Sequence, residues 1–415
     1  MTDERYNEID KMDEDSFRQL SDAEKREYNA KRYLIESRTE IPELMAHIET
    51  AQQGFLPIWG TGFEKLDEKL DGGFLGGNLV VVGAISSLGK TSFVLQIGSQ
   101  IAESGRDVLI FSLEMSKNEL NAKTISRYSY LLSFDGYAYN SVTKKYEEKQ
   151  NPKQAYRLTM GDVLRGRVGR IGDERRKLFD EAVDKTLTLN DHLFIIRDND
   201  VDLDKIEDVI EAHEDATSGR KPFVILDYLQ ILKAREDTRT TDKRLLTDDD
   251  VNRLKDLAVR KDIPILVISS FNRSNYIEPV SMGSFKESGT IEYSSDTLIA
   301  LQYSGMQYQH RWRTNEAGKK EQGYENKQDH DSRVRRLLEK MDEDGAAGKF
   351  LPIDVVVLKN RGVSKGKILF EFCPKYNIFR EKTLQDSREY DYADGFFTDP
   401  FKEADQPAED SLGTV

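Results

Sequence analysis

The sequence predicts an α/β fold in which a mostly parallel central sheet is flanked by helices. An apolar run, a glycine loop and an amphipathic stretch follow one another over residues 79–102, in the order strand, loop, helix. Further apolar runs of strand length alternate with helical stretches, which is the pattern of βαβ units. Near the C-terminus, two apolar runs at 353–358 and 367–372 flank a Lys/Arg/Gly turn and predict a β-hairpin.

Both ends of the chain are acidic and polar. Residues 1–31 carry 10 acidic and 6 basic side chains, and residues 381–415 carry 10 acidic and 3 basic side chains. We expect the first segment to be a polar extension and the second to be a disordered tail. Between them, residues 32–56 show apolar residues at helical spacing, so a helix there must bury its apolar face against its own domain or a neighbouring subunit. The main domain is expected at 57–380.

Composition excludes several classes of protein. No run of about 18 apolar residues occurs, so no membrane span is expected. Met1 to Asp15 is too acidic for a secretory signal. Cys373 is the only cysteine, which excludes an internal disulfide and favours a cytoplasmic location. The net charge is −14, but most of it lies at the two ends, so a nucleic-acid partner is not excluded.

The glycine loop predicts a nucleoside-triphosphate site. Leu79–Val82 forms the strand before it, and the following helix directs its N-terminal N–H groups toward one point. Lys90 suits the β- and γ-phosphates, and the Thr91 hydroxyl suits Mg²⁺. The predicted ATP-binding residues of this loop are Gly83, Ala84, Ser86, Ser87, Leu88, Gly89, Lys90, Thr91 and Ser92. Ala84 stands where the strict motif has glycine, and the alternative is a chance Gly-Lys-Thr after a buried strand.

The remaining elements follow in order. Strands are predicted at 107–112, 193–196, 222–227, 264–270 and 296–303. Helices are predicted at 117–132, 172–185, 204–214 and 251–261. Two stretches are expected to be insertions, 133–158 and 304–350. We expect 133–150 and 233–250 to be loops, and the polar stretch 304–350 to contain one helix, 332–344.

Acidic and polar residues at strand ends complete a hydrolytic site. Asp227 ends a buried strand and suits a second Mg²⁺-organising group. Glu114 ends another strand and suits a base for the attacking water, although a surface glutamate at a helix start is the alternative. Ser270 ends a third strand at the same edge and is added to the predicted ATP-binding residues.

Two cations occupy the turn of the C-terminal hairpin. Lys359 and Arg361 lie in Lys-Asn-Arg-Gly, which is usually just a solvated turn. In an oligomeric ATPase, such a turn can instead reach the phosphates of a neighbouring subunit as an arginine finger. The residues alone leave both interpretations open.

Taken together, these motifs resemble the C-terminal, RecA-like motor domain of DnaB-type replicative helicases, particularly those of phages and mobile elements. The resemblance covers roughly 55–380. It is carried by Pro57 to Asp67, Gly83 to Ser92, Phe111 to Met115, Asp227 to Leu232, Ser269 to Arg273, Lys286 to Glu292 and Lys359 to Gly362. The Ser-Leu-Glu-Met and Asp-Tyr-Leu-Gln signatures are much more specific than the glycine loop.

The resemblance implies a RecA-like P-loop NTPase that uses ATP and Mg²⁺. Lys90, Thr91 and Asp227 would bind phosphate and metal, and Glu114 would be the catalytic base. Lys359 and Arg361 would act in trans, and 32–56 would be a linker helix docked on an adjacent subunit. The implied partners are single-stranded DNA, further copies of the chain in a hexameric ring, and a primase or helicase loader. The implied DNA-binding residues are Lys233, Arg235, Arg239, Lys243, Arg244, Arg273 and Lys286.

The sequence departs from the family at three points. The family has Gln where Ser270 stands, residues 1–31 are expected to be too short to replace the family's helical N-terminal domain, and 304–350 has no assigned counterpart. The function expected is that of an ATP-dependent DNA helicase. Two alternatives stay open: a RecA/KaiC-like oligomeric ATPase in recombination or assembly, and an ATP-binding scaffold that does not unwind DNA.

Overall fold

The computed structural model describes most of residues 58–382 and a few turns before them. The described residues are 20–21, 23–31, 44–45, 48–49, 58–140, 145–198, 201–227, 229, 243–272, 276–285, 288–314, 320–361 and 364–382. Two units are distinguished, 1–57 and 58–415. In the first, helical residues occur at 23–31, 44–45 and 48–49, so most of the predicted linker helix lies outside the described residues. The acidic tail after residue 382 also lies outside them.

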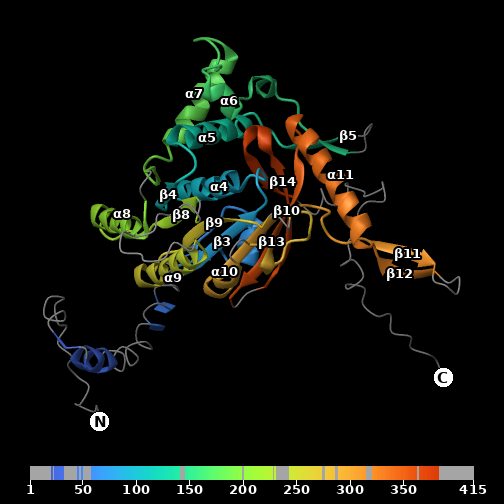
Figure 1. Ribbon diagram of the computed structural model, residues 1–415. Coiled ribbons are helices and arrows are strands. Elements are labelled where there is room, and N and C mark those ends of the chain that lie inside the picture. Colours follow the sequence, from blue (N-terminus) through green and yellow to red (C-terminus); the bar gives the residue numbers. More distant parts are fainter. Residues whose placement is uncertain are drawn as a thin grey trace, which may run out of the picture. The chain divides into compact units, whose positions relative to one another are not determined.

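A nine-stranded sheet forms the centre of the larger unit (Figure 1). Its strand order is β15-β14-β13-β10-β3-β9-β8-β4-β7. The six strands from β10 to β7 are parallel, and β13, β14 and β15 are antiparallel. Their bounds are β3 Leu79–Ala84, β4 Val108–Ser112, β7 Leu193–Ile196, β8 Phe223–Asp227, β9 Ile265–Ser270, β10 Thr297–Tyr303, β13 Leu351–Asn360, β14 Gly366–Cys373 and β15 Ile378–Glu381. The predicted fold class, a mostly parallel sheet with a C-terminal hairpin, is confirmed.

Helices cover both faces of this sheet. On one face lie α3 (Glu64–Lys69), α4 (Lys90–Glu103), α5 (Lys117–Leu131), α6 (Met160–Leu164), α7 (Glu174–Leu187) and α11 (Lys327–Ala346). On the other lie α8 (Leu203–Ala216), α9 (Lys243–Lys261) and α10 (Ser288–Ser294). None of the helices in the described residues is long and apolar enough to cross a bilayer.

The central strands are buried on both faces, which explains their unbroken apolar sequences. In β3, Val80 and Val82 join the core under α4, whereas Leu79 and Val81 join the core under α9. The same alternation occurs along β4 and β8. The two cores therefore fix the register of these strands, because a shift of one residue would exchange their faces.

The predicted loop at 133–150 is wrong, because this segment contains a β-hairpin. Strands β5 (Tyr137–Asn140) and β6 (Lys145–Glu148) pair antiparallel, and a short 3₁₀ helix follows at Pro152–Tyr156. Tyrosines alternate with other residues over 137–140, which is a strand signal that the polar composition of the segment obscured.

The stretch 304–350 is also more regular than predicted. It contains a hairpin, β11 (His310–Thr314) and β12 (Lys320–Tyr324), and α11 exceeds the predicted 332–344 at both ends. Asn326 caps α11 by accepting a hydrogen bond from the Asp329 N–H at 2.9 Å. The capping pair therefore shows where this helix begins.

Helix α9 begins eight residues before the predicted start at Val251, so residues 243–250 are helix and not loop. Thr247, Val251 and Leu254 are buried at helical spacing. Because a polar threonine occupies the first of these positions, the apolar pattern in the sequence starts one turn late. Two further features were not predicted: strand β15, which pairs with β14, and the short antiparallel pair of β1 (Ile58–Trp59) with β2 (Phe74–Leu75).

An aromatic cluster between α4 and the C-terminal hairpin offers a test of the packing. Phe370 is fully buried, and its ring contacts those of Phe63 and Phe93 edge-on at 5.0 and 6.0 Å between centroids. We predict that Phe370→Ala lowers the free energy of unfolding by about 3–5 kcal/mol, as measured by urea denaturation. Ile171→Ala is the control, because Ile171 is 93% exposed and should change this value by less than about 0.5 kcal/mol. Equal effects of the two substitutions would contradict the packing.

Candidate functional site

The phosphate loop connects the end of β3 to the start of α4. Ser87 and Gly89 adopt the left-handed conformation, with φ of 66° and 91°. A Cβ atom on Gly89 would lie 2.6 Å from the ring of Phe372, so both the backbone conformation and the close approach require glycine. The N–H groups of the first turn of α4 have no partner within the helix. This end of α4 is therefore suited to bind phosphate.

Asp227 lies beside this turn, at the end of β8. Its Oδ2 accepts a hydrogen bond of 2.8 Å from Thr91 Oγ1. Asp227 is only 3% exposed, and burial raises its pKa to about 6, with Glu114 raising it further and Thr91, Lys90 and Lys123 acting in the opposite direction. The structure thus brings together the two residues predicted to hold Mg²⁺.

Glu114 lies two residues beyond β4, at the same edge of the sheet. The last residue of β4, Ser112, is in register with Asp227, and the Leu113 N–H donates to the Asp227 carbonyl at 2.7 Å. Glu114 itself is exposed. The negative charge of Glu114 contributes to the raised pKa of Asp227, so the two carboxyl groups interact electrostatically.

Lys90 is held close to its own loop. Its Nζ donates to the carbonyl oxygens of Ala84 and Ile85, each at 3.1 Å. Burial lowers the pKa of Lys90, and the nearby charges of Asp227 and Glu114 oppose this effect. The lysine is therefore a partly desolvated cation facing two carboxylates, and such a cation interacts strongly with phosphate.

Ser270 also reaches the loop. It is the last residue of β9 and is in register with Ala84, the last residue of β3. The Phe271 N–H donates to the Ala84 carbonyl at 3.4 Å. The predicted phosphate-loop residues, Asp227, Glu114 and Ser270 thus share one edge, because parallel strands end together.

A polar cluster behind the loop was not predicted. Lys123 Nζ, on α5, donates to Ser92 Oγ at 3.0 Å and to Asn377 Oδ1 at 2.9 Å. Burial lowers the pKa of Lys123, and Asp227 and Glu119 counteract this. Asn377 is in the left-handed conformation (φ 53°), in the turn before β15. The asparagine in this turn was the one available sequence signal.

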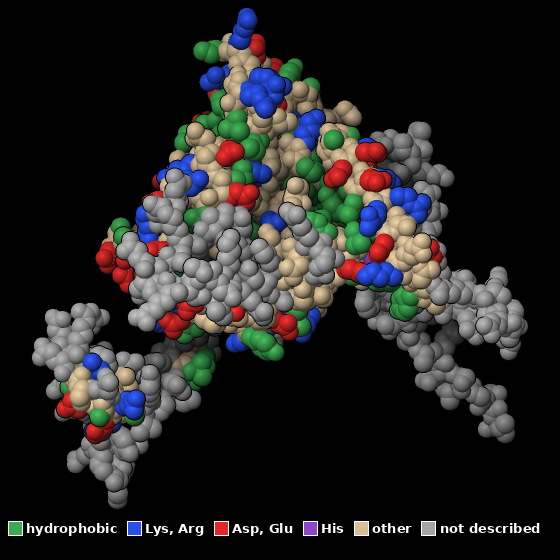
Figure 2. Space-filling view, viewed as in Figure 1, with side chains coloured by type: hydrophobic (Ala, Val, Ile, Leu, Met, Phe, Trp, Pro, Cys, Tyr) green, Lys and Arg blue, Asp and Glu red, His purple; other side chains and the backbone are tan. Residues whose placement is uncertain are grey.

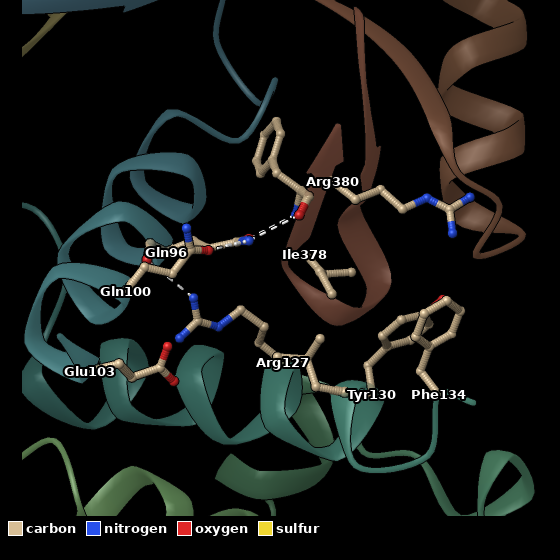
Figure 3. Close-up of a pocket in the computed structure, with 10 residues that line it drawn as sticks. Gln96, Gln100, Glu103, Arg127, Tyr130, Phe134, Ile378 and Arg380 are labelled. Atoms are coloured by element: carbon tan, nitrogen blue, oxygen red, sulfur yellow. Dashed lines mark hydrogen bonds between the residues drawn. The ribbon is translucent and has the colours of Figure 1, made fainter. Parts of the chain in front are cut away.

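One turn further along α4, a second set of hydrogen bonds joins this helix to β15. The Gln96 carboxamide accepts from the Phe379 N–H at 2.8 Å and donates to its carbonyl at 2.9 Å, so it pairs with the β15 backbone as a strand would (Figure 3). A cavity of about 170 Å³ adjoins it between α4, α5 and β15. Buried Arg127 and Tyr130 line this cavity, but none of the predicted catalytic residues does. We therefore treat it as separate from the site.

The hairpin cations lie at the opposite edge of the sheet. Strand β13 is antiparallel to β10, so Lys359 is in register with Leu298 at the start of β10, far from the phosphate loop at the other end. Lys359 Nζ donates to the carbonyls of Glu292, Tyr293 and Ser295 at 2.6, 3.2 and 2.6 Å. All three of its donors are thus used at the C-terminus of α10.

The side chain of Arg361 has fewer hydrogen-bonding partners than that of Lys359. Its Nη1 lies 3.2 Å from Asp296 Oδ1, and its side chain is 57% exposed. Buried Asp296 also accepts from the Leu79 N–H and from Lys255 Nζ, at 2.8 and 2.7 Å. Asp296 therefore fixes the guanidinium of Arg361 at the surface of this edge.

The predicted DNA-binding side chains lie outside the described residues. This holds for Lys233, Arg235, Arg239, Arg273 and Lys286. Lys243 and Arg244 were predicted in a loop, but their backbone belongs to the first turn of α9, and their side chains are not described.

Among the described residues, Lys and Arg side chains gather at the loop between α6 and α7 (top of Figure 2). Arg167 and Arg175 pair with Asp162 at 3.0 and 3.1 Å. These ion pairs connect the glycine-rich loop and the start of α7 to Asp162 on α6.

The residues present fit ATP and Mg²⁺. Mg²⁺ usually takes one or two protein oxygens together with phosphate oxygens and water. The Thr91 hydroxyl and the Asp227 carboxylate, 2.8 Å apart, are such a pair. The left-handed residues of the loop and the N-terminal N–H groups of α4 suit the phosphates.

Comparison with known proteins gives a consistent picture. The family model for the DnaB-like helicase C-terminal domain matches residues 59–381. The replicative DNA helicase DnaB of Helicobacter pylori (strain ATCC 700392 / 26695) is 26% identical over 353 residues, which cover 81% of this chain and 62% of that protein. The replicative DNA helicase DnaB of Geobacillus stearothermophilus is 24% identical over 310 residues, which cover 72% of this chain and 58% of that protein. The chain thus spans about three-fifths of the length of these curated relatives.

Two solved structures share the fold. One is an ATPase domain, which matches with a TM-score of 0.59 and 17% identity, over 83% of this chain and 99% of that domain. The other is a DnaB-like replicative helicase whose structure was described together with its interactions with primase. It matches with a TM-score of 0.59 and 18% identity, over 86% of this chain and 71% of that chain. At these identities the likeness establishes the fold.

The raised pKa of Asp227 predicts a pH dependence of stability. Between pH 3.8, the ordinary pKa of an aspartate, and about pH 6, the folded state binds more protons than the unfolded state. The free energy of unfolding therefore falls as the pH rises through this range, and the whole loss of stability is present above pH 6. Without nucleotide or Mg²⁺, Asp227→Asn should raise the free energy of unfolding at pH 7.5 by about 1–3 kcal/mol. The gain should shrink toward pH 4.

Urea denaturation at both pH values measures this effect. The matched control is Asp215→Asn, which changes an exposed aspartate on α8 and should be nearly neutral at either pH. A pH-independent gain from Asp227→Asn would contradict the assignment.

Proposed function

We propose that this chain, which belongs to the DnaB-like helicase C-terminal domain family, is an ATP-driven DNA helicase that moves along single-stranded DNA. The observation that carries the proposal is the Thr91–Asp227 hydrogen bond beside the phosphate loop. Glu114 follows Leu113, whose N–H donates to the Asp227 carbonyl, and its charge contributes to the raised pKa of Asp227. Phosphate binding, metal binding and a base are thereby gathered in one place, as ATP hydrolysis requires.

Each residue has a separate role in this proposal. Bound Mg²⁺–ATP would supply the phosphoryl group that water attacks and the metal charge that offsets its negative charge. Lys90 binds the phosphate oxygens, and Thr91 and Asp227 hold the metal. Glu114 orients the water and accepts its proton, for which its exposed position at the mouth of the site is suited.

We assign the trans-acting cation to Arg361. Since it lies at the end of the sheet opposite its own phosphate loop, it is placed away from the phosphates of its own site, and a catalytic role requires the site of a neighbouring copy. Its 57% exposure and the Asp296 contact support this role. Lys359, by contrast, acts as a positioning residue that joins β13 to the end of α10. Each active site is then shared by two subunits, as expected in a hexameric ring.

The DNA contacts and further partners rest on the family relationship. We propose that the loops after β8 and β9 bind the DNA backbone through their basic residues, because phosphate tracking requires cations along the channel. A primase or helicase loader is a further proposed partner. The proposed setting is replication of a phage or mobile element.

Steady-state ATPase measurements test the proposal. We expect ATP turnover that single-stranded DNA stimulates, and a loss of at least about a hundredfold in Lys90→Ala, because the phosphate-binding cation is removed. Lys221→Ala, an exposed lysine paired with Glu214, is the control and should retain activity. Turnover without any DNA stimulation or strand separation would favour an assembly or recombination ATPase. Nucleotide binding without turnover would favour a scaffold.

Two substitutions in the hairpin separate trans catalysis from structure. Arg361→Ala should lower kcat by about 10³-fold or more with little change in ATP affinity, because the residue acts on the transition state of the neighbouring site. Lys359→Ala, in contrast, should lower the free energy of unfolding, because three carbonyl groups at the end of α10 lose their hydrogen-bond donor. Activity and urea denaturation are measured for both. An unchanged kcat in Arg361→Ala would exclude the trans role.

A further inference from the structure

The segment after β9 touches the phosphate loop. Tyr276 OH lies 3.0 Å from Ser86 Oγ, within hydrogen-bond distance. Its ring packs against the core under α9. Because Ser86 belongs to the loop that is proposed to surround the phosphates, Tyr276 contacts the nucleotide site without being part of the predicted motif.

Two residues further along, the same segment holds the insertion at 304–350. Glu278 accepts hydrogen bonds from Lys327 Nζ at 2.8 Å and from Tyr308 OH at 3.1 Å. Lys327 is the first residue of α11, and Tyr308 closely precedes the β11–β12 hairpin. One carboxylate therefore joins both ends of the hairpin to the segment after β9.

Buried and stacked contacts hold the base of the insertion together. The Arg333 guanidinium and the Glu325 carboxylate form a buried pair at 2.6 Å, with side-chain exposures of 5% and 0%. Arg333 also donates to the carbonyls of Gly305 and Gln307 at 2.6 and 2.8 Å. Tyr308 stacks on His330 with a centroid distance of 3.9 Å. Glu278 is thus bonded, through Tyr308 and Lys327, to a well-connected part of the insertion.

We infer that Tyr276 and Glu278 are positioning residues that couple the phosphate loop to the insertion, so that nucleotide binding and the state of the insertion influence each other. This inference rests on the proposed nucleotide site. Tyr276 contacts Ser86, and Glu278, two residues further along the same segment, contacts Tyr308 and Lys327. The backbone between Tyr276 and Glu278 therefore connects the two sets of contacts. By linkage, a partner that displaces the insertion changes ATP affinity by the same factor by which ATP changes the affinity for that partner.

Ser270 ends β9 beside Ala84, so the strand before this segment also reaches the phosphate loop. Tyr276 lies six residues later in the chain and reaches the same loop at Ser86. It thereby provides a side-chain link between the phosphate loop and the segment after β9.

A double-mutant cycle on the full chain tests the coupling. Tyr276→Phe keeps the ring and removes the hydroxyl, and Glu278→Gln weakens the attachment of the insertion. The dissociation constant of a non-hydrolysable ATP analogue with Mg²⁺ is measured for each variant and for the pair. We expect each to shift it by about three- to tenfold, and the double variant to shift it no further than the larger single effect. Lys349→Gln is the control, because it breaks an exposed ion pair with Asp344 and should not alter binding.

Hydrogen exchange supplies the second readout. The analogue should change exchange at residues 305–309 in the unsubstituted chain and not in Tyr276→Phe. Tyr308→Phe and Lys327→Gln replace Glu278→Gln if that variant unfolds, and they should shift binding in the same direction. Unaltered exchange, or effects of the two substitutions that multiply, would overturn the coupling even where the analogue binds. Failure of the unsubstituted chain to bind the analogue would instead overturn the proposed function together with the coupling.

Discussion

The hydrogen bond from Thr91 to Asp227 determines how the rest of the site is arranged. It joins the first turn of α4, which follows the phosphate loop, to the end of β8 in the central sheet. Through Leu113, the backbone of Asp227 is also bonded to the chain that carries Glu114. Three segments distant in sequence are therefore fixed relative to one another by contacts of a single residue, and that residue is almost fully buried.

Burial of Asp227 gives this arrangement its electrostatic character. A carboxyl group whose pKa is raised by desolvation is held at a cost to stability, and a bound cation would remove that cost. Lys90 on α4 and Lys123 on α5 interact electrostatically with Asp227, and burial lowers the pKa of each lysine. The site thus concentrates partly desolvated charges of both signs, which is common where function and not stability determines the residues.

Most of the fold and part of the site were predictable because their signals are local. Strands such as β3 and β8 are continuous apolar runs, and parallel strands necessarily bring Asp227, Glu114 and Ser270 to the edge that carries the phosphate loop. The missed strands β1, β5, β11 and β15 are short or at edges, where pairing with a distant partner outweighs composition. Lys123, Asn377 and Tyr276 carry no motif, because tertiary contacts alone bring them to the loop. The contacts of Lys359 with the end of α10 and of Arg361 with Asp296 are likewise tertiary and have no local signal.

The antiparallel direction of β13 has a geometric consequence for assembly. It sends the turn with Arg361 out of the sheet at the edge opposite the phosphate loop. A contact between this turn in one copy and the loop in another joins two unlike surfaces, so a two-fold symmetric dimer cannot satisfy it at both subunits. Any open row of copies leaves one loop and one turn unmatched at its ends. If the proposed contact between copies forms, closure of the row into a circle leaves no loop and no turn unmatched.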